Sequence, residues 1–358
     1  MNVPISRRTL FQTAGAAALA PKAMSGAAGG WPRREGQNTP KLCMILSARE
    51  PSAAAMRRIK QLGVDHVLGG GPPIPWTEAD LRAMMERYKA GGLSVSNLMI
   101  GGFGNTLYGR PGRDEEIDKV RQSIRAAGQA GLPVIEYNFY AHRAVEGYHE
   151  TPGRAGSGML SFDYERVRNL PPLPNEGAHP IGEMWNNVTY FLKAVVPVAV
   201  ESRVRLALHP NDPPAPVSRG SGQIMGSVEG WKRLVDIVPS PCNGITFDCG
   251  VTREMGHDPV EVCRWFGKRD CINHVHFRNV IVKTPREQYT EVFPDEGEVN
   301  MFAVMKELVR QKYPRLIYPE HPRGLDADRE QPKSGQYAAW TYNVAYARAM
   351  LQAAMEAR

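Results

Sequence analysis

Four apolar runs in the second half of the chain each end in a side chain of a type that commonly binds metal ions. These side chains are His209, Asp248, His276 and Glu320. An apolar run that stops at a polar residue is typical of a strand leaving a core. One such residue alone is more often a hydrogen-bonded loop residue or a helix cap, but four on successive strands favour a common site. Imidazole and carboxylate together suit Mn²⁺, Fe²⁺, Co²⁺ or Zn²⁺, so the sequence predicts one divalent metal ion per chain.

Other polar side chains follow the last two of these runs. In a strand, His274 lies on the same face as His276, and we expect it deeper, as a hydrogen-bond donor behind the ligands. His321 directly follows Glu320 and could serve as a general acid or base, or could instead orient Glu320. The guanidinium groups of Arg278 and Arg323 could clamp a substrate carboxylate; surface ion pairs are the alternative.

The residues between these motifs alternate between strand and helix patterns. Helical spacing of apolar residues predicts helices over residues 78–90, 115–130, 184–201, 228–238, 259–266 and 301–311. Short apolar runs predict strands over residues 41–46, 64–69, 93–100, 133–139, 203–210, 244–250, 272–279 and 315–321. Eight strands alternating with helices indicate a (β/α)₈ TIM barrel, an α/β fold, rather than an open doubly wound sheet. The carboxyl ends of barrel strands share one mouth, which would bring the predicted ligands together.

Two stretches break this alternation. Residues 141–180, after the fourth strand, are rich in Gly, Pro, Arg and His, and we expect a long loop over the mouth of the barrel. Residues 213–226 form a second insertion after the fifth strand.

The segment from about Pro133 to the C-terminus resembles the mannonate dehydratases, a family of xylose-isomerase-like TIM barrels. The motif His209-Pro210-Asn211-Asp212-Pro213-Pro214 is similar to the family's HPDDPP. Further matching segments are Tyr137-Asn138-Phe139, Asn243-Gly244-Ile245-Thr246, His276 with Arg278, Gly297-Glu298-Val299-Asn300-Met301, and Pro319-Glu320-His321.

The resemblance implies a lyase that uses Mn²⁺ or Fe²⁺ to dehydrate D-mannonate, or a related aldonate, to 2-keto-3-deoxygluconate. It carries the metal-binding role to His209, Asp248, His276 and Glu320, with Asp248, not Cys249, at the family's Cys position. It implies catalysis by His321 and Tyr337. Substrate contacts are expected from Asn138, Asp212, Arg278 and Arg323.

Two departures from the family concern the substrate. The family's paired histidines after the second strand are absent, and Gly69-Gly70-Gly71 stands there. The loop after the fourth strand also differs.

Two other functions fit parts of the pattern. A xylose-isomerase-like sugar isomerase or epimerase would use Asp248, His276 and Glu320, with Glu136 as the carboxylate opposite Glu320. A sugar-acid binding protein would need no titratable groups around a metal and would normally have two lobes.

The charge of the chain and its N-terminal segment indicate which partners to expect and where the protein is located. The formal charge of +7 comes without a long Lys/Arg run, so we expect no nucleic-acid partner. Arg7-Arg8 before the apolar stretch 14–20 resembles a Tat export signal, which predicts a signal and linker over residues 1–30, a single catalytic barrel over 31–358, and a periplasmic location. The apolar stretch is too short to span a membrane, so we expect no stable membrane insertion. A homo-oligomer is compatible with the sequence.

Overall fold

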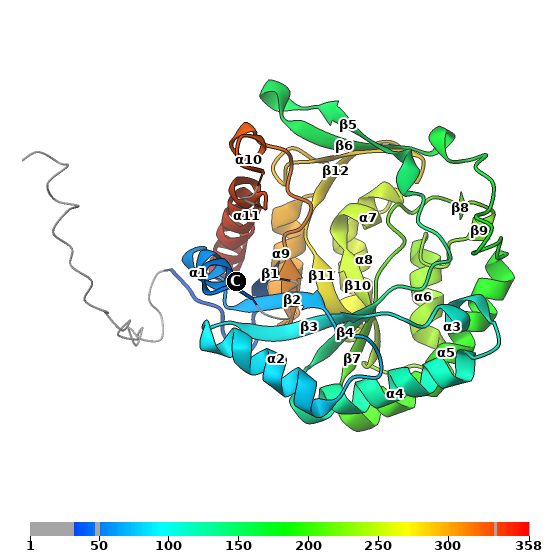
Figure 1. Ribbon diagram of the computed structural model, residues 1–358. Coiled ribbons are helices and arrows are strands. Elements are labelled where there is room, and N and C mark those ends of the chain that lie inside the picture. The colour runs from blue at the N-terminus through cyan, green and yellow to red at the C-terminus, as the bar shows by residue number, and fades with distance from the viewer. Residues whose placement is uncertain (1–31, 47–50, 333–334, 358) are drawn as a thin grey trace, which may run out of the picture. The chain divides into compact units, whose positions relative to one another are not determined.

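Eight parallel strands close into a barrel, with helices packed around the outside (Figure 1). The computed structural model describes residues 32–46, 51–332 and 335–357, and Glu35–Arg358 form one compact unit. The barrel strands, in order around the barrel, are β1 (Lys41–Ile45), β2 (His66–Gly70), β3 (Ser94–Ile100), β4 (Val134–Tyr137), β7 (Arg205–Leu208), β10 (Asn243–Asp248), β11 (Ile272–His276) and β14 (Leu316–Tyr318). The predicted TIM barrel is confirmed, and each of its strands lies within or beside a predicted run.

The outer helices follow the predicted periodicity. They are α1 (Ala53–Gln61), α2 (Glu78–Ala90), α3 (Gly104–Tyr108), α4 (Arg113–Ala130), α5 (Ile181–Ser202), α6 (Val228–Ile237), α7 (Cys249–Glu254), α8 (Pro259–Gly267), α9 (Met301–Arg310), α10 (Asp326–Arg329) and α11 (Tyr337–Glu356). All six predicted helices are present. The start of α2 shows why: the Thr77 side chain accepts a hydrogen bond from the Asp80 backbone N–H at 3.1 Å and caps the helix.

The stretch expected to be a long loop contains regular structure instead. Within it, β5 (Tyr148–Pro152) and β6 (Gly158–Asp163) pair in an antiparallel hairpin. That hairpin joins β13 (Gln288–Val292) and β12 (Asn279–Thr284) in a four-stranded sheet, which we call the lid sheet. The expectation of a loop was wrong because the strands become stable only by pairing with β13, more than a hundred residues later in the chain. The second insertion holds the short hairpin β8 (Val217–Ser218) and β9 (Ser221–Gly222).

The main core lies between the barrel and its helices. Trp231, Phe247 and Phe266 are among its fully buried side chains. The five cysteines are all free. In the described part of the chain, no helix combines the length and the apolar character needed to cross a membrane.

Candidate functional site

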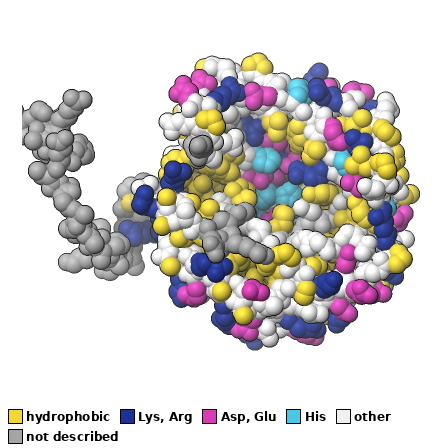
Figure 2. Space-filling view, in the orientation of Figure 1, with side chains coloured by type: hydrophobic (Ala, Val, Ile, Leu, Met, Phe, Trp, Pro, Cys, Tyr) yellow, Lys and Arg dark blue, Asp and Glu magenta, His cyan; other side chains and the backbone are white. Residues whose placement is uncertain are grey.

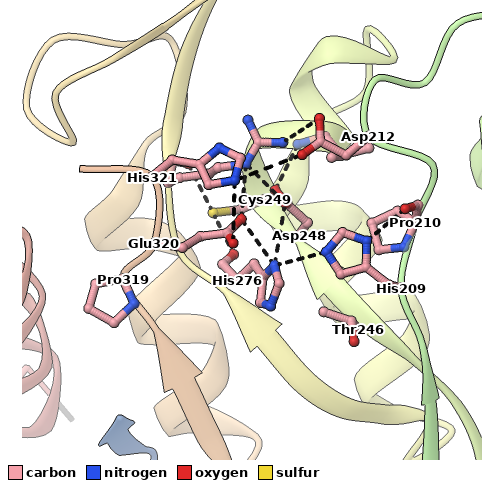
Figure 3. Close-up of polar contacts among 12 residues, drawn as sticks. His209, Pro210, Asp212, Thr246, Asp248, Cys249, His276, Pro319, Glu320 and His321 are labelled. Atoms are coloured by element: carbon pink, nitrogen blue, oxygen red, sulfur yellow. Dashed lines mark hydrogen bonds and ion pairs between the residues drawn. The ribbon is translucent and has the colours of Figure 1, made fainter. Parts of the chain in front are cut away.

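The four predicted metal ligands meet at the mouth of the barrel (Figure 3). His209 follows β7, Asp248 and His276 end β10 and β11, and Glu320 lies two residues past β14. Because parallel strands end on the same side of a barrel, side chains far apart in sequence are brought to one point. Asp248, His276 and Glu320 are buried and place ligand atoms within 4.8 Å of one another.

The Nδ1 atom of His276 is the centre of this group. It lies 3.0 Å from Glu320 Oε1, 3.3 Å from His209 Nε2 and 3.9 Å from Asp248 Oδ2. Ligand atoms about 2.1 Å from one ion lie roughly 3.0–3.4 Å from each other. The distances from His276 to Glu320 and His209 match that spacing, and Asp248 lies about half an ångström farther out.

His209 is held in an orientation suited to metal binding. Its Nδ1 lies 2.7 Å from the backbone carbonyl of Pro210 and donates to it, which leaves a lone pair on Nε2 facing His276. Burial and the neighbouring His276 lower the pKa of His209 to about 3, so its imidazole is neutral. A neutral imidazole with an aimed lone pair is the form that binds metal ions.

The other groups carry the charges of a site built around a cation. Burial lowers the pKa of His276, but Glu320, Glu136 and Asp248 outweigh burial and raise it to about 9. Burial raises the pKa of Asp248 to about 6, against the opposing effect of Arg278. The carboxylates around His276 thus favour positive charge at this position.

Acidic groups outnumber arginines in and around the site. Six carboxylates are buried here, against two buried guanidinium groups; the carboxylates are Glu136, Asp212, Asp248, Glu254, Glu291 and Glu320, and the arginines are Arg278 and Arg323. Uncompensated buried charge is costly, and a divalent cation would offset it. The donor set and the charge therefore both fit a divalent ion.

Cys249 points away from the ligands. Its Sγ donates to the backbone carbonyls of His276 at 3.4 Å and Arg278 at 3.3 Å. Asp248, by contrast, places Oδ2 toward His276 and accepts a hydrogen bond from the Val251 N–H at Oδ1. Of these two neighbours, the structure brings only Asp248 to the site.

The two arginines expected to clamp the substrate are engaged with protein carboxylates. Arg278 lies 2.6 Å from Glu254, 3.0 Å from Asp248 and 3.2 Å from Glu320. Arg323 lies 2.8 Å from Glu291. Both arginines are buried, and the contacts that the structure shows for Arg278 and Arg323 hold the carboxylates of the site in place. Their expected contact with a substrate carboxylate stays a prediction.

His321 lies between the metal group and the lid sheet. Its Nδ1 is 2.8 Å from Glu291 Oε2, and its Nε2 is 3.6 Å from Glu320 and 3.9 Å from Asp212. Burial lowers the pKa of His321, but Glu291 and Glu320 outweigh burial and raise it to about 9. Its backbone φ of +48° is unusual for a residue other than glycine, and such strain is concentrated at functional sites.

Asp212, expected to contact substrate, faces protein groups. It accepts a hydrogen bond from the Tyr148 hydroxyl at 2.7 Å and lies 3.7 Å from Arg143. The peptide bond between Asp212 and Pro213 is cis.

Two further predicted residues lie apart from the group of ligands. The hydroxyl of Tyr337, at the start of α11, donates to the backbone carbonyl of Arg58 on α1 at 3.1 Å. The expected catalytic position of Tyr337 is thus not what the structure shows, because the phenol packs toward a neighbouring helix. Asn138 is half-buried at the end of β4, where its amide nitrogen lies 3.6 Å from Met99 Sδ.

The sequence predictions omitted several groups that complete the site. Glu254 follows Asp248 on α7, and Glu291 comes from β13, a strand that we did not predict. Glu136, considered only for an epimerase, is buried on β4; it accepts hydrogen bonds from Thr246 at 2.7 Å and Asn97 at 3.0 Å. The position of Glu136, directly after the apolar start of a barrel strand, was the signal by which the sequence could have identified it.

His274 does lie deeper than His276, as expected. In the described part of the chain neither of its ring nitrogens has a hydrogen-bond partner, so it is no donor to the ligands.

Comparisons with known proteins converge on one family. A family model described as D-mannonate dehydratase matches residues 180–358. A mannonate dehydratase of Thermotoga petrophila is 28% identical over 341 residues, covering 83% of this chain and 93% of its own. One of Streptococcus equi subsp. zooepidemicus is 29% identical over 289 residues, covering 73% and 79%.

Solved structures agree with the sequence comparisons. The mannonate dehydratase of Streptococcus suis serotype 2 superposes with a TM-score of 0.79 at 25% identity, covering 89% of this chain and 95% of its own. An L-ribulose 3-epimerase superposes with a TM-score of 0.56 at 14% identity, covering 89% and 97%, and shows likeness of fold alone.

Proposed function

We propose, because the chain belongs to the D-mannonate dehydratase family, that it is a metal-dependent hydro-lyase. In this proposal it removes water from D-mannonate, or a closely related aldonate, to give 2-keto-3-deoxygluconate or the matching keto-deoxy acid. One observation carries the proposal: three side chains of metal-ligand type, His209, Asp248 and Glu320, lie around the Nδ1 atom of a fourth, His276, with His321 beside them.

The proposed metal is Mn²⁺ or Fe²⁺, held by His209, Asp248, His276 and Glu320. Mixed imidazole and carboxylate donors suit both ions. When bound, such an ion polarises the oxygens of the substrate carboxylate and makes the proton on the neighbouring carbon more acidic.

His321 is the proposed general acid. Glu291 accepts the hydrogen bond from its Nδ1, so its Nε2 is the nitrogen that points toward the ligand group. A pKa raised to about 9 keeps the ring protonated at neutral pH. A proton on Nε2 can therefore be given to the hydroxyl that leaves carbon 3. Tyr337, whose hydroxyl faces α1, has no part in this proposal.

The geometry argues against the alternative of a sugar isomerase or epimerase. That mechanism would need Glu136 on the open side of the substrate, opposite Glu320. Glu136 is instead buried below His276, 3.6 Å from its Nε2, and held by Thr246 and Asn97. Both of its carboxylate oxygens are thus engaged by neighbouring protein side chains.

Mass spectrometry of the product tests the proposal. Purified protein loaded with Mn²⁺ is incubated with D-mannonate, and we expect a keto acid lighter than the substrate by one water. His321→Asn should abolish turnover while metal content stays normal. A product of unchanged mass, together with an inactive Glu136→Gln variant, would support the epimerase instead.

We also propose that the protein is exported in folded form and acts in the periplasm, as a single catalytic barrel behind a signal and linker. The support is Arg7-Arg8 and the apolar stretch that follows, which lie outside the described residues. Replacing Arg7-Arg8 by Lys-Lys should leave the protein in the cytoplasm. Equal amounts of mutant and wild type in the periplasmic fraction would refute the proposal that Arg7-Arg8 form an export signal.

A further inference from the structure

Arg143 is a partly exposed cation at the mouth of the barrel, and the proposed function gives it no role. It follows β4, in the insertion that also holds β5 and β6. Its Nε donates a hydrogen bond to the backbone carbonyl of Asp212 at 2.8 Å. The Arg143 side chain is 40% exposed, whereas that of Arg278, which lies beside the same aspartate, is 2% exposed. Arg143 therefore lies on the outer side of Asp212, where a bound molecule can reach it.

One oxygen of Asp212 lies between Arg143 and His321. Asp212 Oδ2 is 3.7 Å from Arg143 Nη2 and 3.9 Å from His321 Nε2. The other oxygen, Oδ1, faces Arg278 and the Tyr148 hydroxyl. The His321 side chain is 30% exposed, so both groups beside Oδ2 border the open part of the mouth. Figure 2 shows histidine, acidic and basic side chains together in a hollow of this face.

The guanidinium group of Arg143 is charged and held in one orientation. Burial lowers the pKa of Arg143, but Asp212, Tyr140 and Glu320 are among the neighbours that outweigh burial and raise it. The bond to Asp212 uses Nε, and a second hydrogen bond joins Arg143 to the Tyr140 side chain. Nη2 lies too far from Asp212 Oδ2 for a hydrogen bond. A guanidinium group has five N–H donors in one plane, so Arg143 can donate to a bound molecule as well.

The proposed reaction gives the substrate a direction past these groups. Its carboxylate and carbon 2 lie at the metal ligands, and carbon 3 lies beside His321 Nε2, which protonates the leaving hydroxyl. In Figure 3, Glu320 and Asp212 lie on different sides of the His321 ring, 3.6 Å and 3.9 Å from its Nε2. The rest of the carbon chain therefore runs away from Glu320, past Asp212 and toward Arg143.

We infer that Arg143 binds the hydroxyl groups on carbons 5 and 6 of the substrate and thereby selects six-carbon acids over shorter ones. This inference rests on the proposed function and adds a specificity-determining residue to it. The fixed plane of a guanidinium group suits two neighbouring oxygen acceptors. Hydrogen bonds from a charged donor raise affinity by about 10-fold to 100-fold, so loss of Arg143 should be measurable.

The test combines Arg143→Met with two acids of different length. L-Erythronate has the configuration of D-mannonate at carbons 2 and 3 but lacks carbons 5 and 6. In the Mn²⁺-loaded enzyme, Arg143→Met should lower kcat/KM for D-mannonate by about 10-fold to 100-fold more than kcat/KM for L-erythronate. Arg143→Lys, which keeps the charge but donates from a single nitrogen, should recover part of that loss. Equal effects on the two acids would mean that Arg143 acts only through Asp212 and His321, which overturns the inference.

Arg168→Met is the matched control. Arg168 belongs to the same insertion, is 41% exposed, lies over the Tyr164 ring and pairs with Glu165 and Glu287. It should keep the wild-type ratio of kcat/KM for the two acids, with metal content normal in all three variants. A ratio that changes equally in Arg168→Met and Arg143→Met also overturns the inference.

Calorimetry keeps this result separate from failure of the proposed function. If neither acid loses water, the proposed function fails, but binding of the two acids to the metal-loaded protein can still be compared. The same measurement serves if wild type turns over D-mannonate alone. Tighter binding of D-mannonate than of L-erythronate, with the difference lost in Arg143→Met, supports the role of Arg143. A difference that is absent in wild type, or that persists in Arg143→Met, contradicts it.

Discussion

Asp248 and Cys249 are adjacent residues with opposite environments, which makes them a test of the metal site at the scale of single side chains. Asp248→Asn should lower metal content and activity, because it removes the charge of a carboxylate that lies 3.9 Å from His276 Nδ1. Cys249→Ser should keep both, since its Sγ faces backbone carbonyls away from the site. Metal analysis of the purified variants distinguishes them. Loss of metal in Cys249→Ser with normal metal in Asp248→Asn would reverse the assignment.

Glu136 acts on the site through charge. Its Oε1 lies 3.6 Å from His276 Nε2, too far for a direct hydrogen bond, in a fully buried position. A divalent ion competes with a proton for His276 and carries twice the charge of that proton. Loss of the Glu136 carboxylate therefore weakens metal binding more than it weakens protonation of His276. Glu136→Gln should therefore lower metal affinity by about 10-fold to 100-fold, the range found for groups behind metal ligands.

Competition with a chelator measures that affinity in Glu136→Gln. The control is Glu307→Gln, which changes another buried glutamate, one that pairs with Arg310 and Arg264 on the helices outside the barrel. Glu307→Gln can lower stability but should not change metal affinity. Equal losses in the two variants would show that the effect of Glu136 is merely structural.

At the scale of elements, the lid sheet places one carboxylate, that of Glu291, beside His321 at the mouth of the barrel. β13 carries Glu291, which accepts the hydrogen bond from His321 Nδ1 and holds Arg323. Glu291→Gln removes a charge that raises the pKa of His321, so the pKa falls and less of the acid form is present. We expect kcat to drop by at least about tenfold and the high-pH limb of activity to move to lower pH, with metal content unchanged.

The matched control for Glu291→Gln lies next to the same strand. Glu287→Gln changes a partly exposed residue before β13 that pairs with Arg168. Its pH profile should match that of wild type. An unshifted profile in Glu291→Gln would mean that Glu291 serves only to hold the sheet in place.

The barrel strands could be predicted from sequence because each is a short apolar run with its own boundaries. The same reasoning selected the four candidate ligands that the structure brings together, since each ends or closely follows such a run. It missed β13, whose sequence QYTEV is mostly polar and whose place depends on pairing with β6. Glu291 was missed with it. It also missed α11, where small alanines such as Ala339 and Ala347 form much of the buried face and give a weak apolar pattern.

Tyr337 shows a different limit of prediction from sequence, which concerns the direction of a side chain. A match to a family motif assigned it a catalytic role, but the direction of a side chain at the start of a helix depends on the neighbouring helix. Its hydroxyl bonds to α1. Placements expected from the resemblance thus agree with the structure where the residue ends a barrel strand, because the fold itself fixes where such a side chain points.

At the scale of the whole molecule, the metal site joins distant parts of the barrel, so metal binding should stabilise the folded protein. The ligands come from four strands spread over more than a hundred residues, and the unfolded chain cannot hold them together. A ligand at 100 times its Kd adds about 2.7 kcal/mol to the free energy of unfolding. At roughly 2 °C for each kcal/mol, Mn²⁺ should raise the Tm of chelator-treated protein by roughly 5 °C.

Thermal unfolding with and without Mn²⁺ measures this shift in Tm. The His209→Ala variant distinguishes binding at the proposed site from binding of Mn²⁺ elsewhere on the protein. The variant lacks a neutral imidazole aimed at the site, so its Tm should hardly respond to Mn²⁺. Mg²⁺, which prefers oxygen ligands and keeps its water, should raise the wild-type Tm less than Mn²⁺ does. If Mn²⁺ stabilises wild type and His209→Ala equally, the ion binds elsewhere. If it stabilises neither, the buried carboxylates of the barrel mouth must be balanced by protons, and the proposed metal chemistry loses its basis.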